Sequence, residues 1–147
     1  MKKILALFFV LCASALAAQD IAFVNDLAKK ETATFGDAAK LFVVAAGGQS
    51  QGFEADAQFL ESKGIIKASG YAEGDRLRKG TLALMIANHM KLGDSLMFAL
   101  IGTRRYAVTA CVAAEIMIPG GGEWDILSGS ELIETIRVMA EKSGGAK

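Results

Sequence analysis

Residues 55–90 read ADAQFLESKGIIKASGYAEGDRLRKGTLALMIANHM, and this stretch decides the fold. Its first part predicts a helix that ends at Gly64, a residue suited to a left-handed C-cap, before the apolar pair Ile65-Ile66. After a loop, a second helix carries apolar positions at i, i+3, i+4 and i+7, which is the spacing of one helical face: Leu82, Met85, Ile86 and His89. The stretch is therefore a helix, an apolar stop, a loop and a second helix.

The same unit occurs three times along the chain. TFGDAAKLFV from Thr34, RKGTLALMIA from Arg78 and SGSELIETIR from Ser128 align without gaps, each with a small residue third, a polar residue fourth and helical periodicity beyond. Residues 20–30 and 108–125 supply the front helices of the first and third copies. We therefore expect helix–loop–helix units at residues 19–48, 53–92 and 103–142.

The 147 residues suffice for one domain with a real core. The prediction is an all-α fold, a compact helical bundle of about six helices in a single domain over residues 19–142, with pseudo-threefold symmetry and a flexible tail at 143–147. The segment GDSLMFALIGTRR, residues 93–105, reads as core plus connection. His89, Lys91 and Asp94 interrupt any apolar window of membrane-spanning length, so no stable membrane span is expected.

Two of the three copies begin with a capping box, in which a hydroxyl and an acid three residues later satisfy each other's free N–H groups. Ser128 pairs with Glu131 in this way, and Thr34 with Asp37. The middle copy has Arg78 at the cap and Thr81 in place of the acid. Its basic residues therefore lie at the positive end of the helix dipole.

The amino terminus has the features of an export signal. Lys2 and Lys3 precede an apolar stretch at residues 4–11, and Ala15-Leu16-Ala17 fits a cleavage site. Residues 1–18 are therefore predicted to be a signal peptide, and the mature protein to be periplasmic or cell-surface associated. Cys12 follows Leu11 rather than the small residue that precedes a lipidated cysteine, so we read it as part of the signal.

Charge and cysteine content narrow the class of function. The chain has 16 basic and 16 acidic side chains, so removal of Lys2 and Lys3 leaves a small acidic excess. Such a balance argues against nucleic-acid or anionic-membrane binding driven by net charge. Cys111 is then the only cysteine, which precludes an intramolecular disulfide, and its sequence context predicts a buried structural thiol.

The repeated unit resembles the S-layer homology (SLH) repeat of bacterial envelope proteins, which runs A-x-x-L-x-x-x-G-I-I, a Gly-Tyr loop and then I-T-R-A-E-F-A. The middle copy matches at Ala57, Leu60, Gly64, Ile65, Ile66, Gly70, Tyr71 and Leu77 to Ala83; the third matches at Leu127, Ser128, Ser130 and Glu131; the first matches at Thr34, Gly36, Asp37 and Ala39. The resemblance implies a helical module that binds an acidic cell-wall polymer. The arginine that serves this binding in the family is replaced here by Phe35, Lys79 and Gly129, of which Lys79 alone has similar chemistry.

The candidate ligand-binding residues are basic or aromatic: Tyr71, Arg76, Arg78, Lys79 and Trp124. The three basic residues at a helix start could form an anion site, which Arg104-Arg105 could join, or could point into water. Trp124 follows three glycines; it could stack on a sugar ring or fold back over the core, and the core is the expected place.

No enzyme is predicted. His89 and Cys111 lie on predicted core faces, and Glu54, Asp56 and Glu61 are expected on a solvated helix face. One histidine, one mature cysteine and no acidic motif at ligand spacing predict no metal site and no cofactor.

The leading hypothesis is a non-enzymatic exported protein of the cell envelope that associates with peptidoglycan or another cell-surface glycan. The alternative is a structural protein–protein interaction module of the envelope that has lost glycan binding. A third, a membrane-active protein, would require residues 96–101 to be exposed.

Overall fold

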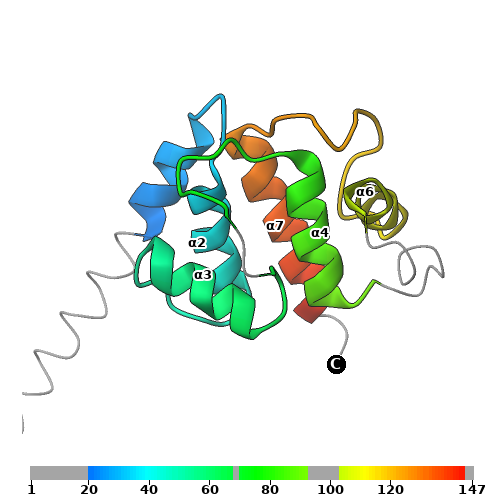
Figure 1. Ribbon diagram of the computed structural model, residues 1–147. Coiled ribbons are helices and arrows are strands. Elements are labelled where there is room, and N and C mark those ends of the chain that lie inside the picture. Colours follow the sequence, from blue (N-terminus) through cyan, green and yellow to red (C-terminus); the bar gives the residue numbers. More distant parts are fainter. Residues whose placement is uncertain (1–19, 68–69, 93–102, 145–147) are drawn as a thin grey trace, which may run out of the picture.

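The computed structural model describes residues 20–67, 70–92 and 103–144, and within these ranges the protein is all-helical, as expected (Figure 1). A helix over residues 20–28 precedes α2 (Phe35–Ala45), α3 (Phe53–Ser62), α4 (Lys79–Met90), α6 (Arg104–Ala113) and α7 (Gly129–Gly144). The only β-type pairing in these ranges consists of two isolated bridges, Thr34 with Arg76 and Arg78 with Ile126. The predicted signal peptide lies outside the described residues, as do residues 93–102 of the predicted connection.

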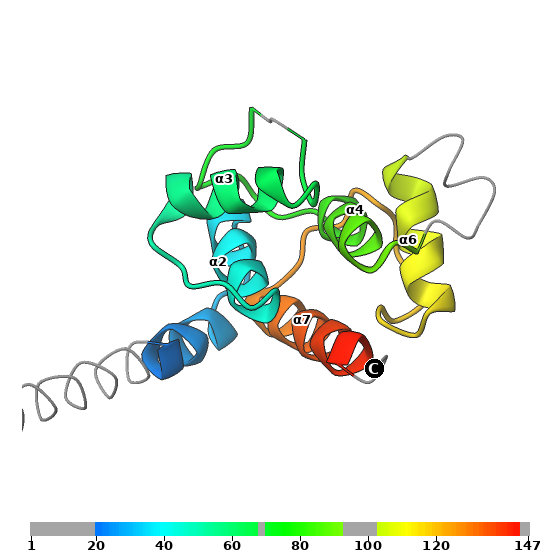
Figure 2. The same cartoon turned by 90° about the horizontal axis from the view of Figure 1, so that it is seen from below.

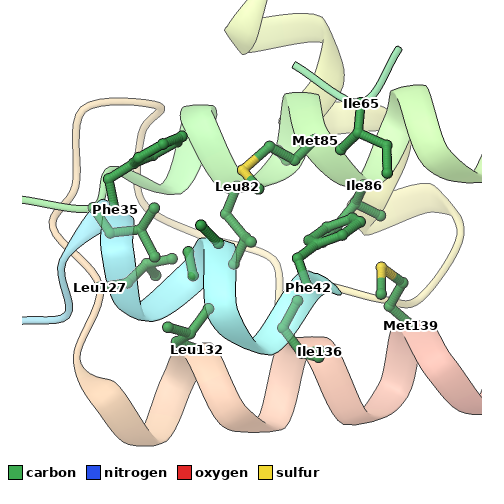
Figure 3. Packing of buried hydrophobic residues seen from close by; sticks show 14 of the residues in the cluster. Phe35, Phe42, Ile65, Leu82, Met85, Ile86, Leu127, Leu132, Ile136 and Met139 are labelled. Carbon is green, nitrogen blue, oxygen red and sulfur yellow. The ribbon is translucent and has the colours of Figure 1, made fainter. Parts of the chain in front are cut away.

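The helices pack around one apolar core. α2 packs against both α3 and α7, while α4 packs against α6 (Figures 1 and 2). Figure 3 shows Phe42 of α2, Leu82 and Ile86 of α4, and Ile136 and Met139 of α7 converging on the same interior. The apolar faces of three helices that are distant in sequence thus form a single core.

Three extended segments, each directly before a helix, are joined by a closed ring of backbone hydrogen bonds. The Leu77 N–H donates to the Ala33 carbonyl at 2.9 Å, the Leu127 N–H to the Leu77 carbonyl at 3.0 Å, and the Ala33 N–H to the Leu127 carbonyl at 2.8 Å. Each segment therefore gives one bond and receives one. All three side chains are buried, so the ring lies over the core.

α4, which like α3 and α6 has no side-chain cap, is capped by backbone from the next unit. No Arg78 side-chain bond caps α4. Instead the N–H groups of Lys79 and Gly80 donate to the carbonyls of Asp125 and Glu123, at 2.8 and 2.9 Å. These N–H groups have no partner within the helix, so the loop of the third unit supplies acceptors that a cap residue ordinarily provides.

α2 and α7 begin with the predicted capping boxes. The Thr34 hydroxyl accepts from the Asp37 N–H, and the Asp37 carboxylate accepts from the Thr34 N–H. The Glu131 carboxylate accepts from the Ser128 N–H at 2.8 Å, while the Ser128 hydroxyl accepts from the Glu131 N–H. Both expectations are confirmed.

The small residues at the helix starts allow backbones to approach closely. A Cβ on Gly80 would lie 2.9 Å from the Glu123 carbonyl oxygen, and one on Gly36 would lie 3.0 Å from that of Glu73. In the third unit the close approach is one residue earlier, at Gly129, where a Cβ would overlap the Leu27 carbonyl, and Ser130 in the third position is exposed. The crossing of segments at the ring thus requires the repeated small residue in the first two units only.

Three local expectations can be compared with the structure. Gly64 has φ +68°, which confirms the left-handed C-cap. Asp56 is only 3% exposed; its carboxylate accepts from the Ser50 hydroxyl and the Gln51 N–H, so the prediction that it lies on a solvated face was wrong. α7 continues to Gly144, two residues into the predicted tail. In the described ranges, no helix has the length and apolarity to cross a bilayer.

Gly129→Ala should destabilise the fold, because its new methyl group meets backbone rather than a movable side chain. We expect a loss of about 2–3 kcal/mol in the free energy of unfolding, measured by urea denaturation. Gly74→Ala is the matched control, since no atom lies within 4 Å of the added Cβ. Equal midpoints for the two variants would contradict the close approach at Gly129.

Glu131→Gln tests the cap of α7 through its pH dependence. Hydrogen bonds from the Ser128 N–H and hydroxyl lower the pKa of Glu131, so the folded state favours the carboxylate. This stabilisation is present above the pKa of the unfolded chain and is lost as pH falls through the folded-state pKa. Wild type should exceed the variant by about 0.5 kcal/mol at neutral pH, and the difference should vanish in acid. Glu31→Gln, which removes an exposed carboxylate outside any helix, is the control.

Candidate functional site

A cavity of about 340 Å³ lies beside the backbone ring, and three of the five candidate residues line it. Its lining is Phe35, Tyr71, Asp75, Arg76, Leu77, Arg78, Thr81 and Arg104. Tyr71 comes from the loop after α3 and Arg104 is the first residue of α6. The structure therefore brings Tyr71, Arg76 and Arg78 together and adds Arg104, but it leaves Arg105 outside.

Extended backbone at the ring explains why two arginines face the cavity. Successive side chains alternate between the two sides of an extended segment. Leu77 is buried in the core, and its neighbours Arg76 and Arg78 are both exposed. One constraint, the burial of Leu77, thus fixes the outward direction of both guanidinium groups.

Two contacts position Tyr71 at the wall of the cavity. Its ring stacks on buried Phe35 with 4.5 Å between the ring centroids and 23° between the planes. Its hydroxyl accepts a hydrogen bond from Arg104 Nη2 at 2.5 Å. The aromatic face and the Arg104 guanidinium are therefore oriented by one another before any ligand arrives.

The positive charges of the three arginines in the cavity are available to a ligand. In the part of the chain that the structure describes, no carboxylate forms an ion pair with Arg76, Arg78 or Arg104. Asp75 also lines the cavity, and one oxygen of its carboxylate accepts from the Ala72 N–H at 2.8 Å. Guanidinium groups bind carboxylate or phosphate through paired N–H donors, so an anionic group suits this cavity.

Lys79 does not face the cavity. Its ammonium donates to the carbonyls of Ile118 and Gly120, at 3.1 and 2.5 Å, and so fastens the glycine-rich loop to the start of α4. The side chain lines a different groove, beside α7. Sequence reasoning missed this role because both acceptors are backbone atoms about forty residues away in the chain.

Trp124 also lies outside the cavity, and it does not cover the core. It is 60% exposed, so the expectation that it folds back over the core was wrong. The Arg78 Cζ lies 4.9 Å from the ring centroid, which is a cation–π distance. Arg105 and Val108 of α6 line the same shallow hollow as Trp124.

The two residues considered for nucleophilic chemistry pack against the core, Cys111 fully buried and His89 half-buried. Burial raises the pKa of the Cys111 thiol to about 12, and the thiol donates to the Ala83 carbonyl at 3.5 Å. The half-buried His89 meets the Phe42 ring edge-on at 5.4 Å, and this burial lowers the pKa of His89. Cys111 is thus protonated at neutral pH. The described residues contain no cluster of three potential metal ligands.

Lys79→Met separates a structural role for Lys79 from a ligand-binding one. Loss of its two bonds to carbonyls should lower the free energy of unfolding by about 1 kcal/mol in urea denaturation. Arg76→Met removes the same charge from a neighbouring exposed position, and it should leave stability within about 0.5 kcal/mol of wild type. If both variants unfold at the wild-type midpoint, Lys79 does not fasten the loop.

The site therefore combines three guanidinium groups with one oriented aromatic ring around a single cavity. This combination provides charge for an anionic group and an apolar face for a ring. Comparison of the chain with protein-family models, with curated proteins and with solved structures finds no match.

Proposed function

We propose that the protein is a non-enzymatic, exported protein of the cell envelope that associates with peptidoglycan or another cell-surface glycan. The observation that carries the proposal is the cavity formed by Tyr71, Arg76, Arg78 and Arg104. A wall glycan presents acidic substituents next to sugar rings. The arginines would bind the acid, and Tyr71 would contact an apolar sugar face.

Preorganisation makes this cavity a better candidate than a set of surface arginines. Ordering a long side chain on binding costs about 0.5–1.5 kcal/mol. Tyr71 is already fixed between Phe35 and Arg104, so part of that cost is met on folding. Arg78 is likewise positioned, by its contact with the Trp124 ring.

The export signal and the resemblance to SLH repeats supply the cellular context of the proposal. Lys2-Lys3, the apolar stretch and the Ala15-Leu16-Ala17 site would direct the chain to the compartment that contains the wall. In this proposal the chain is a degenerate SLH module, and its ligand site has moved to arginines outside the family's motif position.

One structural finding favours the alternative, an envelope protein–protein interaction module that has lost glycan binding. The family's binding arginine is replaced by Phe35, Lys79 and Gly129. Phe35 is buried, Lys79 is bonded to carbonyls, and Gly129 packs against the Leu27 backbone. None of the three therefore offers a free side chain to a ligand.

A pull-down with purified, protein-free sacculi tests the glycan proposal. The mature chain, residues 19–147, is compared with Arg76→Ala/Arg104→Ala, which removes two cavity charges and leaves Lys79 in place. We expect the variant to lose about tenfold in affinity, and wild-type binding to weaken as salt screens the charges.

Lys29→Ala/Arg137→Ala is the matched control, since it removes two positive charges outside the residues that line the cavity. It should bind like wild type. Equal losses in both double variants would indicate general charge attraction rather than a site. Absence of wild-type binding at low salt would reject the glycan proposal in favour of the protein-interaction module.

A further inference from the structure

An apolar groove of about 610 Å³ lies between the end of α6 and α7. Figure 2 shows that the loop after α6 runs between these two helices. The lining of the groove is largely apolar, with Val112, Ile116, Met117, Leu127 and Val138, and it includes the exposed Ile118. A groove of this size and composition accommodates large apolar side chains.

The groove has an acidic rim. Glu115, Glu131 and Glu134 line it, together with one cation, Lys79, whose ammonium is bonded to backbone carbonyls. Glu134 is ion-paired with Arg137, which lies outside the lining, so Glu115 and Glu131 carry the acidic character of the rim. Lys142 approaches only one oxygen of Glu115, at 3.4 Å, and the Glu115 side chain remains 86% exposed. The groove therefore favours an apolar group that is accompanied by positive charge.

Exposed apolar side chains, some with positive charge beside them, lie at the same edge of the molecule. Ile118, Trp124 and Ile126 are 79%, 60% and 43% exposed, and they lie within one short stretch of chain. Trp124 is accompanied by Arg78, which stacks on its ring, and by Arg105, which lines the same hollow. Clustered exposed apolar residues mark interaction surfaces, and tryptophan and arginine are the residues most enriched among binding hot spots.

We propose that this edge binds a second copy of the chain about a twofold axis. The exposed stretch that carries Ile118 and Trp124 enters the α6–α7 groove of the partner, and the partner's stretch enters the groove of the first copy. A surface that contains both an acidic apolar groove and a basic apolar projection is self-complementary, as a twofold interface requires.

The charge of the groove favours a second copy of the chain over an acidic glycan or an anionic membrane. An acidic glycan or an anionic membrane surface would meet the carboxylates of Glu115 and Glu131 at the rim. The mature chain has only a small acidic excess, so two copies repel each other little. The proposal does not rest on glycan binding: of the cavity residues only Arg78 takes part, through its contact with Trp124, and Tyr71, Arg76 and Arg104 do not line this groove.

The mature chain contains its own fluorescent probe of dimerisation. Trp124 is the only tryptophan, so its fluorescence reports directly on this edge. Light scattering across a wide range of concentration should show monomers converting to dimers. The Trp124 emission should shift to shorter wavelength over the same range, as the ring leaves water.

Variants of the projection and of the groove should each weaken the dimer. Trp124→Ala and Thr135→Arg, the latter placing a charge in the groove, should each raise the dissociation constant at least about tenfold. Ile21→Ala is the control, because Ile21 is another exposed large aliphatic residue, on the helix at residues 20–28; it should dimerise like wild type.

A charge exchange gives a test that loss of folding cannot imitate. Glu115→Lys and Arg105→Glu should each weaken the dimer, and the double variant should recover at least part of the lost affinity. A chain that stays monomeric at the highest concentration would overturn the proposal. So would a dimer that is insensitive to both Trp124→Ala and Thr135→Arg, or a monomer whose Trp124 emission shifts only with anionic lipid vesicles.

Discussion

The closed ring of backbone hydrogen bonds among Ala33, Leu77 and Leu127 is the constraint on which the rest of the structure depends. Each segment must be extended to take part, must bury its own side chain, and must pass directly into a helix. The neighbouring N–H groups then find acceptors in the loop of the next unit. A buried backbone group without a hydrogen-bond partner costs about 1–3 kcal/mol. Displacing one segment would therefore leave unpaired backbone groups on the other two.

The ring also positions the candidate site. Leu77 can be buried only if its neighbours face outward, and those neighbours are Arg76 and Arg78. Phe35 follows the first ring segment and forms the surface on which Tyr71 stacks. The cavity is therefore supported by the most constrained part of the fold, although every group that would touch a ligand comes from a loop or a helix end.

Local signals in the sequence predicted a large share of this architecture. Apolar spacing predicted the helices, the Ser128 and Thr34 boxes predicted two caps, and Gly64 predicted a left-handed turn, because each depends on residues within a few positions. The predictions that failed depend on distant partners. Lys79 is fixed by the Ile118 and Gly120 carbonyls, which no motif marks.

The same limit explains why sequence reasoning placed Asp56 and Trp124 wrongly. Asp56 has the polarity of a solvated helix face, yet its carboxylate is buried against Ser50 and the Gln51 N–H. Trp124 has the hydrophobicity of a core residue, yet the core is already filled by α2, α4 and α7. Arg104 joins Tyr71 only because the fold brings the start of α6 beside the loop after α3.

Closure of the ring also fixes the number of units. In an open solenoid each repeat contacts only its neighbours, so repeats can be added or lost and the ends can fray independently. Here the first and third segments bond to each other, at Ala33 and Leu127, so the array has no terminal repeat. A fourth unit would have no place in the ring, and a two-unit chain would leave donors and acceptors without partners. Copy number in this protein is thus set by geometry, and the three units are expected to fold and unfold together.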